Sequence, residues 1–500
     1  MTPLNAMTDL EALRKAAVIL DRENERLIQE NLKLQKENLK LKGGGNLQQR
    51  MEELERQLEA LRRDKFGDSS EKRPSPAPPK TEKKKQTGHG PRKQTSLERV
   101  EEIHRLDEPD KACPKCGGEL KEWAGQFEES EEIDIIPRRY VIRHHKRQKY
   151  RCACQACVET ALGVPKLIPG GRYSPDFAVD VAVSKYLDHM PLERQVRAMA
   201  REGLIVDSNT LWDQIHALYR HLAPVHDRLH AYVLSKPVIG TDETHWKYLG
   251  PNGAEHEQKR WQAWTVVTDD AVSYRIVPSR SAEAARSVLN DYGGIVMADG
   301  YGVYEHLAKR DGIVLANCWA HVRRKFFELE NSAPTEVRDE ILELIGRLYL
   351  IDQEAQGDAA GLARVRHEQS RGVIDQIRQW LFAQRTNALP RSALGKAVDY
   401  ALARWTGLTR FLDDARIPLD NNASERALRG PVVGRKNHYG SKSERGTQVA
   451  ARLYSLCESA KLAGIDPRVY LRGAVWSALR GEDVWLPHEV RANAASLPRV

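Results

Sequence analysis

The fold of this chain is decided by five short stretches: KPVIGTDET (236–244), RWQAWTVVTDD (260–270), VSYRIVPSR (272–280), GGIVMADG (293–300) and GIVLANCW (312–319). Each is an apolar run bounded by glycine, proline or polar residues, which is typical of a buried β-strand. A tight polar turn joins the second stretch to the third and predicts an antiparallel pair. The sequence therefore predicts a sheet in the middle of the chain.

Helical patterns surround these strands. Residues 281–292 and 301–310 separate the third, fourth and fifth strands and predict helices, the first with Ser281 as its cap. From about residue 320 to about 415 the periodicity is helical throughout, and helical signal returns after 420–422. The pattern indicates an α/β region that is interrupted by a long helical insertion.

Three acidic residues stand out by position. Asp242 ends the first strand, Asp299 ends the fourth, and Glu425 lies on a predicted helix after the helical stretch. A ribonuclease-H-like fold brings acids from these three places to one edge of its sheet. An aspartate after a strand is, taken alone, more often a turn or cap residue, so the interpretation depends on the joint order. We interpret the three as a catalytic, metal-binding triad.

The chemistry of phosphodiester cleavage explains why three acids suffice. Cleavage and strand transfer are in-line displacements at a charged phosphorus, which two divalent cations promote by activating the attacking oxygen and stabilising the leaving one. Mg²⁺ and Mn²⁺ prefer carboxylate oxygen and water, and they use few protein ligands. We therefore expect two Mg²⁺ (or Mn²⁺) ions at Asp242, Asp299 and Glu425.

Other residues near the triad are weaker candidates for the site. Glu243 and Asp420 are second choices for the site. His321 either lies near the metals or packs with Trp319, and we favour packing or an orienting role. Basic residues crowd the helix that carries the third acid and predict contacts with DNA phosphates. Those we assign to DNA binding are Arg429, Arg435 and Lys436.

A cysteine cluster predicts a structural zinc site. Cys113 and Cys116 form a CxxC knuckle, and CACQAC follows at 152–157. Two such groups suit one tetrahedral Zn²⁺, because each short loop lets two sulfurs reach the ion. We favour Cys113, Cys116, Cys154 and Cys157 as ligands; the alternative replaces Cys154 by Cys152. A closed site with four thiolates has no catalytic role.

Basic residues are concentrated between the two cysteine groups, in RRYVIRHHKRQKYR (138–151). Such a density suits phosphate contacts, and a solvated ribbon face is the alternative. The residues we assign to DNA binding here are Arg138, Arg139, Arg143, Lys146, Arg147 and Lys149.

The N-terminal half contains further organisation. Leucines recur at sevens from Leu13 to Leu41, with asparagines at sevens from Asn24 to Asn38, which predicts a self-associating coiled coil. A basic, proline-rich linker follows. The stretch LERQVRAMAREGLIVDSNTLWDQIH (192–216) has helix–turn–helix form, with Asp207 or Ser208 as the cap of the second helix.

Bulk properties narrow the class of protein. The 500 residues carry 78 Lys and Arg against 70 Asp and Glu, which gives a net charge of +8. This excess is consistent with a polyanionic partner, but it is weak evidence by itself in a chain of this length. No apolar run approaches the roughly 20 residues of a membrane helix. With clustered cysteines and no apolar signal core at the start, we expect a cytoplasmic protein rather than a disulfide scaffold.

The chain resembles the insertion sequence 66 family of bacterial transposases over nearly its whole length. The matching motifs are TDETHWKYL (241–249), ADGYGVYEHL (298–307), CWAHVRRKFFE (318–328), DNNASERALRGPVVGRKNHYGSKSERG (420–446) and the knuckle CPKCGGEL (113–120). The resemblance implies an acid-triad nuclease with a helical insertion, acting at the terminal inverted repeats of its own element with small accessory proteins. CACQAC departs from the family's usual CxxC and leaves the fourth zinc ligand open.

We therefore expect a multidomain α+β protein that acts as a DNA transposase by two-metal hydrolysis and strand transfer. The alternatives are a non-catalytic DNA-binding regulator and a cellular nuclease or resolvase. Expected partners are double-stranded DNA, as element ends and target, and a second copy of the chain; the expected location is the bacterial cytoplasm, with the nucleoid. The expected parts are a coiled coil (8–64), a linker (65–97), a zinc-binding module (98–170), a helical region (171–235), the first part of the catalytic core (236–330), a helical insertion (331–415), the second part of the core (416–470) and a C-terminal tail (471–500).

Overall fold

The computed structural model describes residues 99–492, with gaps at 102, 108–110, 112, 129, 131, 134–137, 152, 154–156, 251–260, 330–333, 356–358 and 390. The described chain divides into two compact units, one ending at Arg139 and the other beginning at Tyr140. The expected coiled coil and linker lie outside the described residues. No described helix is both long and apolar enough to cross a membrane.

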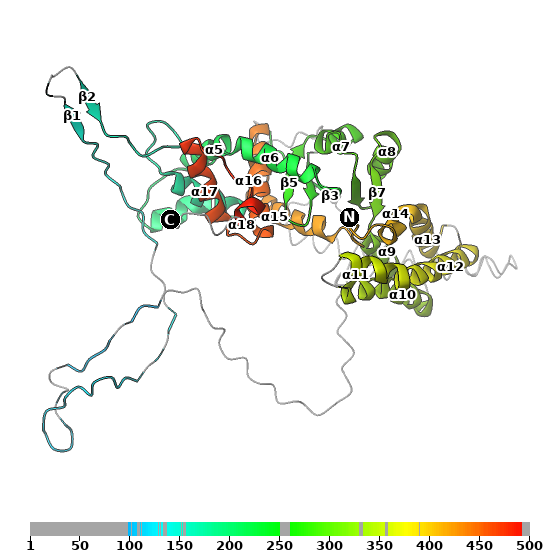
Figure 1. Ribbon diagram of the computed structural model, residues 1–500, viewed down its shortest axis with the longest axis horizontal. Helices are drawn as coiled ribbons and strands as arrows, with labels where there is room; N and C mark the ends of the chain where they lie inside the picture. Colours follow the sequence, from blue (N-terminus) through cyan, green and yellow to red (C-terminus); the bar gives the residue numbers. More distant parts are fainter. Residues whose placement is uncertain are drawn as a thin grey trace, which may run out of the picture. The chain divides into compact units, whose positions relative to one another are not determined.

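A five-stranded sheet forms the centre of the second unit, in the spatial order β5-β4-β3-β6-β7. Figure 1 labels β5, β3 and β7 of this sheet. Its strands are β3 (Val238–His245), β4 (Gln262–Val267), β5 (Val272–Val277), β6 (Ile295–Ala298) and β7 (Val314–Asn317). The first three pair antiparallel, whereas β3, β6 and β7 run parallel. All five sequence-predicted strands are therefore confirmed.

Short helices connect the parallel strands. Helix α7 (Ala282–Leu289) precedes β6, and Ser281 caps it by accepting the N–H of Ala284 at 3.3 Å. Helix α8 (Gly302–Arg310) links β6 to β7, and α9 (Trp319–Phe327) follows β7. The cap and the helices agree with the sequence prediction.

Helix α16 (Glu444–Leu462) covers the edge strand β5. Ser455 and Ser459 on this helix accept the N–H groups of Tyr274 and Val272 at 2.8 and 2.9 Å, and Ser459 also donates to the Val272 carbonyl. An exposed edge strand is a template for pairing with other chains. The two serines satisfy backbone groups of this edge, which explains why hydroxyls stand on the buried face of the helix.

A helical region precedes the sheet and contains α3 (Pro175–Tyr186), α4 (Leu192–Arg201), α5 (Ser208–His221) and α6 (Ala223–Leu234). Helices α4 and α5 form the predicted helical pair. Asp207, not Ser208, is the cap, and it accepts the N–H of Thr210 at 2.7 Å.

The C-terminal tail expected from residue 471 onward is wrong as a description of this segment. That boundary falls inside α17 (Pro467–Arg480), which packs on α3. Arg468 bonds Asp180 at 2.8 Å, and the Trp476 indole donates to Asp176 at 2.8 Å. Tyr470, Leu471 and Val475 are buried in the main core, so the segment is part of the fold.

The insertion between β7 and α15 (Asn422–His438) is all helical in the described residues, as predicted (Figure 1). It contains α10 (Thr335–Glu354), α11 (Ala359–Val365), a π-helical turn η3 (Arg366–Ser370), α12 (Arg371–Asn387), α13 (Ala393–Ala403), α14 (Trp405–Thr409) and a 3₁₀ turn η4 (Arg410–Leu412). With α9 these helices build a second apolar core, distinct from the one beneath the sheet.

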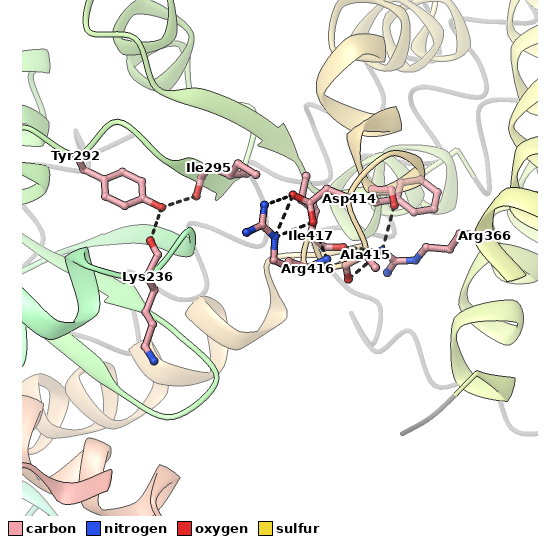
Figure 2. Close-up of polar contacts among 9 residues, drawn as sticks. Lys236, Tyr292, Ile295, Arg366, Asp414, Ala415, Arg416 and Ile417 are labelled. Atoms are coloured by element: carbon pink, nitrogen blue, oxygen red, sulfur yellow. Dashed lines mark hydrogen bonds and ion pairs between the residues drawn. The ribbon is translucent and has the colours of Figure 1, made fainter. Parts of the chain in front are cut away.

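One buried arginine joins the insertion to the segment that returns to the core. Arg366 is 2% exposed and forms a two-bond pair with Asp352. It also donates to the carbonyls of Phe411 and Ile417 at 3.1 and 3.0 Å and to that of Ala415 at 3.4 Å. Figure 2 shows Arg366 beside Ala415 and Ile417, in the return segment (residues 411–417). A buried charge is stable only when several partners satisfy it. The bonds of Arg366 therefore fix the position of the return segment.

Helix α15 approaches strand β3 closely at a glycine. A Cβ atom on Gly240 would lie 2.6 Å from the Ser424 hydroxyl and 3.1 Å from the Asn421 side-chain oxygen. Both of these side chains are buried. A residue larger than glycine at 240 would therefore force the helix away from the strand.

We expect Gly240→Ala to lower the free energy of unfolding by about 1–3 kcal/mol, the usual cost of an extra methyl group in a packed interior. Gly293→Ala is the matched control, because a Cβ there meets nothing within 4 Å. Urea unfolding followed by circular dichroism measures both. Equal destabilisation by the two substitutions would contradict the close approach.

Candidate active site

The parallel register of β3 and β6 brings two of the predicted acids together. Gly240 pairs with Met297, so Asp242 and Asp299 each lie two residues further on and are level with one another. Asp299 follows the end of β6 as expected, but β3 runs on to His245, so Asp242 lies inside its strand and not at its end. Asp242 accepts the N–H of Glu243 at 2.8 Å, and Asp299 accepts that of Tyr301 at 2.9 Å. These backbone contacts fix where both carboxylates stand.

Glu425 reaches the same end from the first turn of α15. Asn421, just before the helix, is 1% exposed and donates its side-chain amide to the Thr241 carbonyl at 2.8 Å. Ser424 donates to the side-chain oxygen of Asn421 at 2.7 Å. Thr241 and Ser424 are the neighbours of Asp242 and Glu425, so this buried contact places the third carboxylate near the first.

Asp299 and Glu425 are close enough to Asp242 to affect its pKa. The pKa of Asp242 is raised from 3.8 to about 7, first by burial and then by the charge of Glu243. The charges of Asp299 and Glu425 raise it further, against the hydrogen bond from the N–H of Glu243. In the part of the chain that the structure describes, Asp242 forms no ion pair.

This donor set fits a hard divalent cation. Carboxylate oxygens are the ligands that Mg²⁺ and Mn²⁺ prefer, and a cation relieves the repulsion that raises the Asp242 pKa. The described residues contain no group of three or more His, Cys, Asp or Glu side chains that is already arranged to hold an ion. Mg²⁺ keeps several waters and shares substrate phosphates, so it needs few protein ligands.

Glu243 and Asp420, the second choices, have other partners. Glu243 is 1% exposed and accepts bonds from Arg280 and from the Tyr304 hydroxyl, the latter at 2.8 Å. Asp420 accepts the backbone N–H of Asn422 at 3.0 Å, at the start of α15. Glu243 is thus held by Arg280 and Tyr304, and Asp420 also accepts the side-chain amide of Asn422 at 2.6 Å.

Helix α9 contributes two cationic or titratable groups beside Glu425. The His321 ring nitrogen Nε2 lies 3.5 Å from one Glu425 oxygen, and Arg324 Nη2 lies 3.7 Å from the other. The Trp319 ring packs instead on Trp405, and its indole donates to the Leu408 carbonyl at 2.8 Å. His321 therefore faces the site, where it can orient Glu425.

The basic residues predicted on α15 differ in their surroundings. Arg429 and Lys436 are exposed on the helix. Arg435 is half-buried and donates to the Thr244 hydroxyl at 3.0 Å, and burial lowers its pKa. Arg429 and Lys436 can meet DNA directly, whereas Arg435 joins α15 to β3.

The zinc-binding residues are described only in part. Cys113 and Cys116 form a knuckle in the first unit, in which the N–H of Gly117 bonds the Cys113 carbonyl at 2.8 Å. The N–H groups of Lys115 and Cys116 lower the pKa of the Cys113 thiol, which suits a thiolate ligand. Cys157 is exposed in the second unit, and Cys152 and Cys154 lie outside the described residues.

The basic side chains assigned to DNA binding in residues 138–151 are exposed. Arg138 and Arg139 end the first unit, and the exposed side chains in the second unit are Arg143, Lys146, Arg147 and Lys149. Strand β1 (Lys149–Arg151) pairs antiparallel with β2 (Val158–Thr160), and Arg147 donates to the Ala161 carbonyl at 2.6 Å beside them.

Sequence reasoning missed the residues that position the acids. Asn421, Ser424, Tyr304 and Arg280 act through contacts with elements far away in the sequence, so no local pattern reveals them. A run of three polar residues at 420–422, directly before a helix, was the available signal for Asn421.

Comparison with known proteins gives two family matches. A model described as "Transposase IS66 family" matches residues 170–449, more than half of the chain. A model described as "zinc-finger binding domain of transposase IS66" matches residues 110–155. Both agree with the resemblance seen in the motifs.

Similar proteins occur in Sinorhizobium fredii (strain NBRC 101917 / NGR234). The uncharacterized protein y4jD is 34% identical over 73% of this chain and 74% of its own length. The uncharacterized protein y4qI is 30% identical over 79% of this chain and 75% of its own length. The uncharacterized protein y4hP is 31% identical, with coverages of 74% and 71%.

The raised pKa of Asp242 predicts a pH-dependent effect of Asp242→Asn on the metal-free protein. The folded protein binds this proton more tightly than the unfolded chain, so the ionised carboxyl destabilises the fold. This cost is absent below pH 3.8, grows as the pH rises and is complete above about 7. We expect the substitution to raise the melting temperature by a few degrees at pH 8 and by less at pH 5.

Thermal unfolding in EDTA measures this difference. Asp291→Asn, at an exposed aspartate, is the control. A melting-temperature change that is the same at both pH values for Asp242→Asn would contradict the crowding of charge at the site.

Proposed function

Because this chain belongs to the IS66 family of transposases, we propose that it cuts and joins DNA strands with two divalent cations at Asp242, Asp299 and Glu425. Two observations support this proposal: the β3–β6 register, which sets Asp242 level with Asp299, and the bond from Asn421 to Thr241, which brings the start of α15 to β3. Family membership makes it a DNA-processing transposase; the metal chemistry and the residue roles are our proposal.

We further propose that the core is ribonuclease-H-like. The strand order β5-β4-β3-β6-β7 supports this, because the first three strands in sequence are antiparallel and the last two are added in parallel on the other side of β3. The acids follow in the order that such a core requires: first strand, fourth strand, later helix. The long helical insertion then separates the second acid from the third.

Bound Mg²⁺ or Mn²⁺ would supply Lewis-acid activation of the attacking oxygen and stabilisation of the leaving one. The protein's own residues would bind and orient. Asp242, Asp299 and Glu425 hold the ions, His321 orients Glu425, and Arg429 and Lys436 hold DNA phosphates along α15. Hydrolysis at each element end would release a 3′-hydroxyl that attacks target DNA.

The proposed DNA substrate is the terminal inverted repeat of the protein's own element. The match to a transposase zinc-finger domain and the exposed basic side chains in residues 138–151 support binding of the repeat by the N-terminal part of the chain. Self-association through residues 8–64, small accessory proteins of the element and action at the nucleoid belong to the same proposal.

We expect Glu425→Gln to lower cleavage of a duplex carrying the repeat by at least about 100-fold, because it removes a charged metal ligand. Binding of the same duplex in EDTA should not change. Glu444→Gln is the matched control, because Glu444 is an exposed acid in the first turn of the neighbouring helix α16. Cleavage by Glu425→Gln at the normal rate would refute the triad, and repeat binding without cleavage by the natural protein would favour a regulator.

The open choice of zinc ligand gives a separate prediction. We expect Cys154→Ser to lose the bound zinc, measured by elemental analysis of the purified chain, and Cys152→Ser to keep it, because four thiolates complete a tetrahedral site. The reverse result would make Cys152 the fourth ligand. Zinc retained by both variants would exclude both assignments.

A further inference from the structure

Arg280 is an exposed arginine that is nevertheless held in place beside the candidate site. It lies in the connection between β5 and α7, and 47% of its side chain is exposed. Its Nε and Nη2 atoms lie 2.7 and 2.5 Å from one oxygen of Glu243. Its guanidinium carbon stands 3.9 Å from the centre of the Tyr301 ring.

The partners of Arg280 are themselves fixed. Glu243 is 1% exposed, and its second oxygen accepts the Tyr304 hydroxyl at 2.8 Å. The Tyr301 hydroxyl donates to the Arg280 carbonyl at 2.8 Å. The guanidinium therefore has one settled orientation without any ligand present.

This arginine stands on the Asp299 side of the site. The same turn that carries Asp299 also carries the ring beneath Arg280, because Asp299 accepts the N–H of Tyr301. Side chains alternate along a strand, so Glu243 points away from the face of β3 that Asp242 shares with α15. Glu243 therefore holds Arg280 through its hydrogen bonds and is not part of the acid triad.

The remaining donors of Arg280 are suited to an anion. A guanidinium has five N–H groups in a planar fork, and the bonds to Glu243 use only one of its edges. In the part of the chain that the structure describes, Glu243 is its only hydrogen-bond acceptor. Arginine stacked on an aromatic ring and fixed by a carboxylate loses little freedom on binding phosphate in a charge-assisted bond.

We propose that Arg280 binds a backbone phosphate of the DNA strand that enters the site, and that Glu243 and Tyr301 position it for this contact. The inference rests on the proposed function and extends it, because it assigns a substrate contact to a residue outside the acid triad. The alternative is a purely structural pair, in which Arg280 only neutralises the buried Glu243.

The test pairs Arg280→Met with single methylphosphonates, which remove the charge of one phosphate. These are placed in turn at each phosphate around the cleavage position of a repeat duplex, and kcat/KM is measured. For the natural protein we expect a loss of about tenfold at one or two positions, as for one charge-assisted bond. Arg280→Met should lower kcat/KM on unmodified DNA by about tenfold. A methylphosphonate at those same positions should then lower the kcat/KM of Arg280→Met no further.

Two further variants keep the test clear of folding effects. Arg480→Met is the matched control, because Arg480 is 48% exposed and also forms a two-bond pair with a carboxylate, Glu482. It should respond to every methylphosphonate as the natural protein does. Arg280→Met leaves Glu243 buried without its partner. The same scan is therefore repeated with Glu243→Gln added both to the natural protein and to Arg280→Met.

The outcomes separate this inference from the proposed function. If the effects of Arg280→Met and of the methylphosphonate multiply at every position, Arg280 touches no phosphate and the inference is overturned. The scan is repeated as equilibrium binding with Glu425→Gln, which needs no cleavage. Arg280-dependent phosphate binding by a natural protein that cuts no DNA would overturn the enzyme proposal and leave the phosphate contact standing.

Discussion

One buried amide side chain determines where the candidate site can form. Asn421 donates to the carbonyl of Thr241, 180 residues away in the chain, and accepts from Ser424, which is near it in sequence. Only an amide of this length offers both a donor and an acceptor, since aspartate has no donor and serine is shorter. These neutral hydrogen bonds involve Thr241 and Ser424, the residues next to Asp242 and Glu425. They hold the two carboxylates near each other although the carboxylate charges repel.

The long insertion leaves this geometry intact because it is tied down where it returns. Arg366 bonds three carbonyls between Phe411 and Ile417, a few residues before Asn421. Its partner Asp352 is on α10, inside the insertion. The helical part and the third acid are therefore connected by a short, buried path, although the two halves of the core are far apart in sequence.

Much of the fold could be predicted because it depends on local patterns. Apolar runs gave the five strands, and acids near their ends gave Asp242 and Asp299, although β3 runs on past Asp242. Nothing local showed which face of β3 is covered by α15, so Glu243 stayed a second choice beside Asp242. Asn421 and Arg280 depend on tertiary contacts that no local pattern encodes. The boundary at 471 falls inside α17, and the packing of this helix on α3 is another tertiary contact that no local pattern encodes.

The serines of α16 have a consequence for damaged copies of the gene. Helices α15 to α17 come late in the chain, yet two serines of α16 bind the backbone of the edge strand β5. A product truncated before α16 would carry a sheet with an open side, which is a template for pairing with other chains. Such a product should aggregate and should not accumulate as a folded protein.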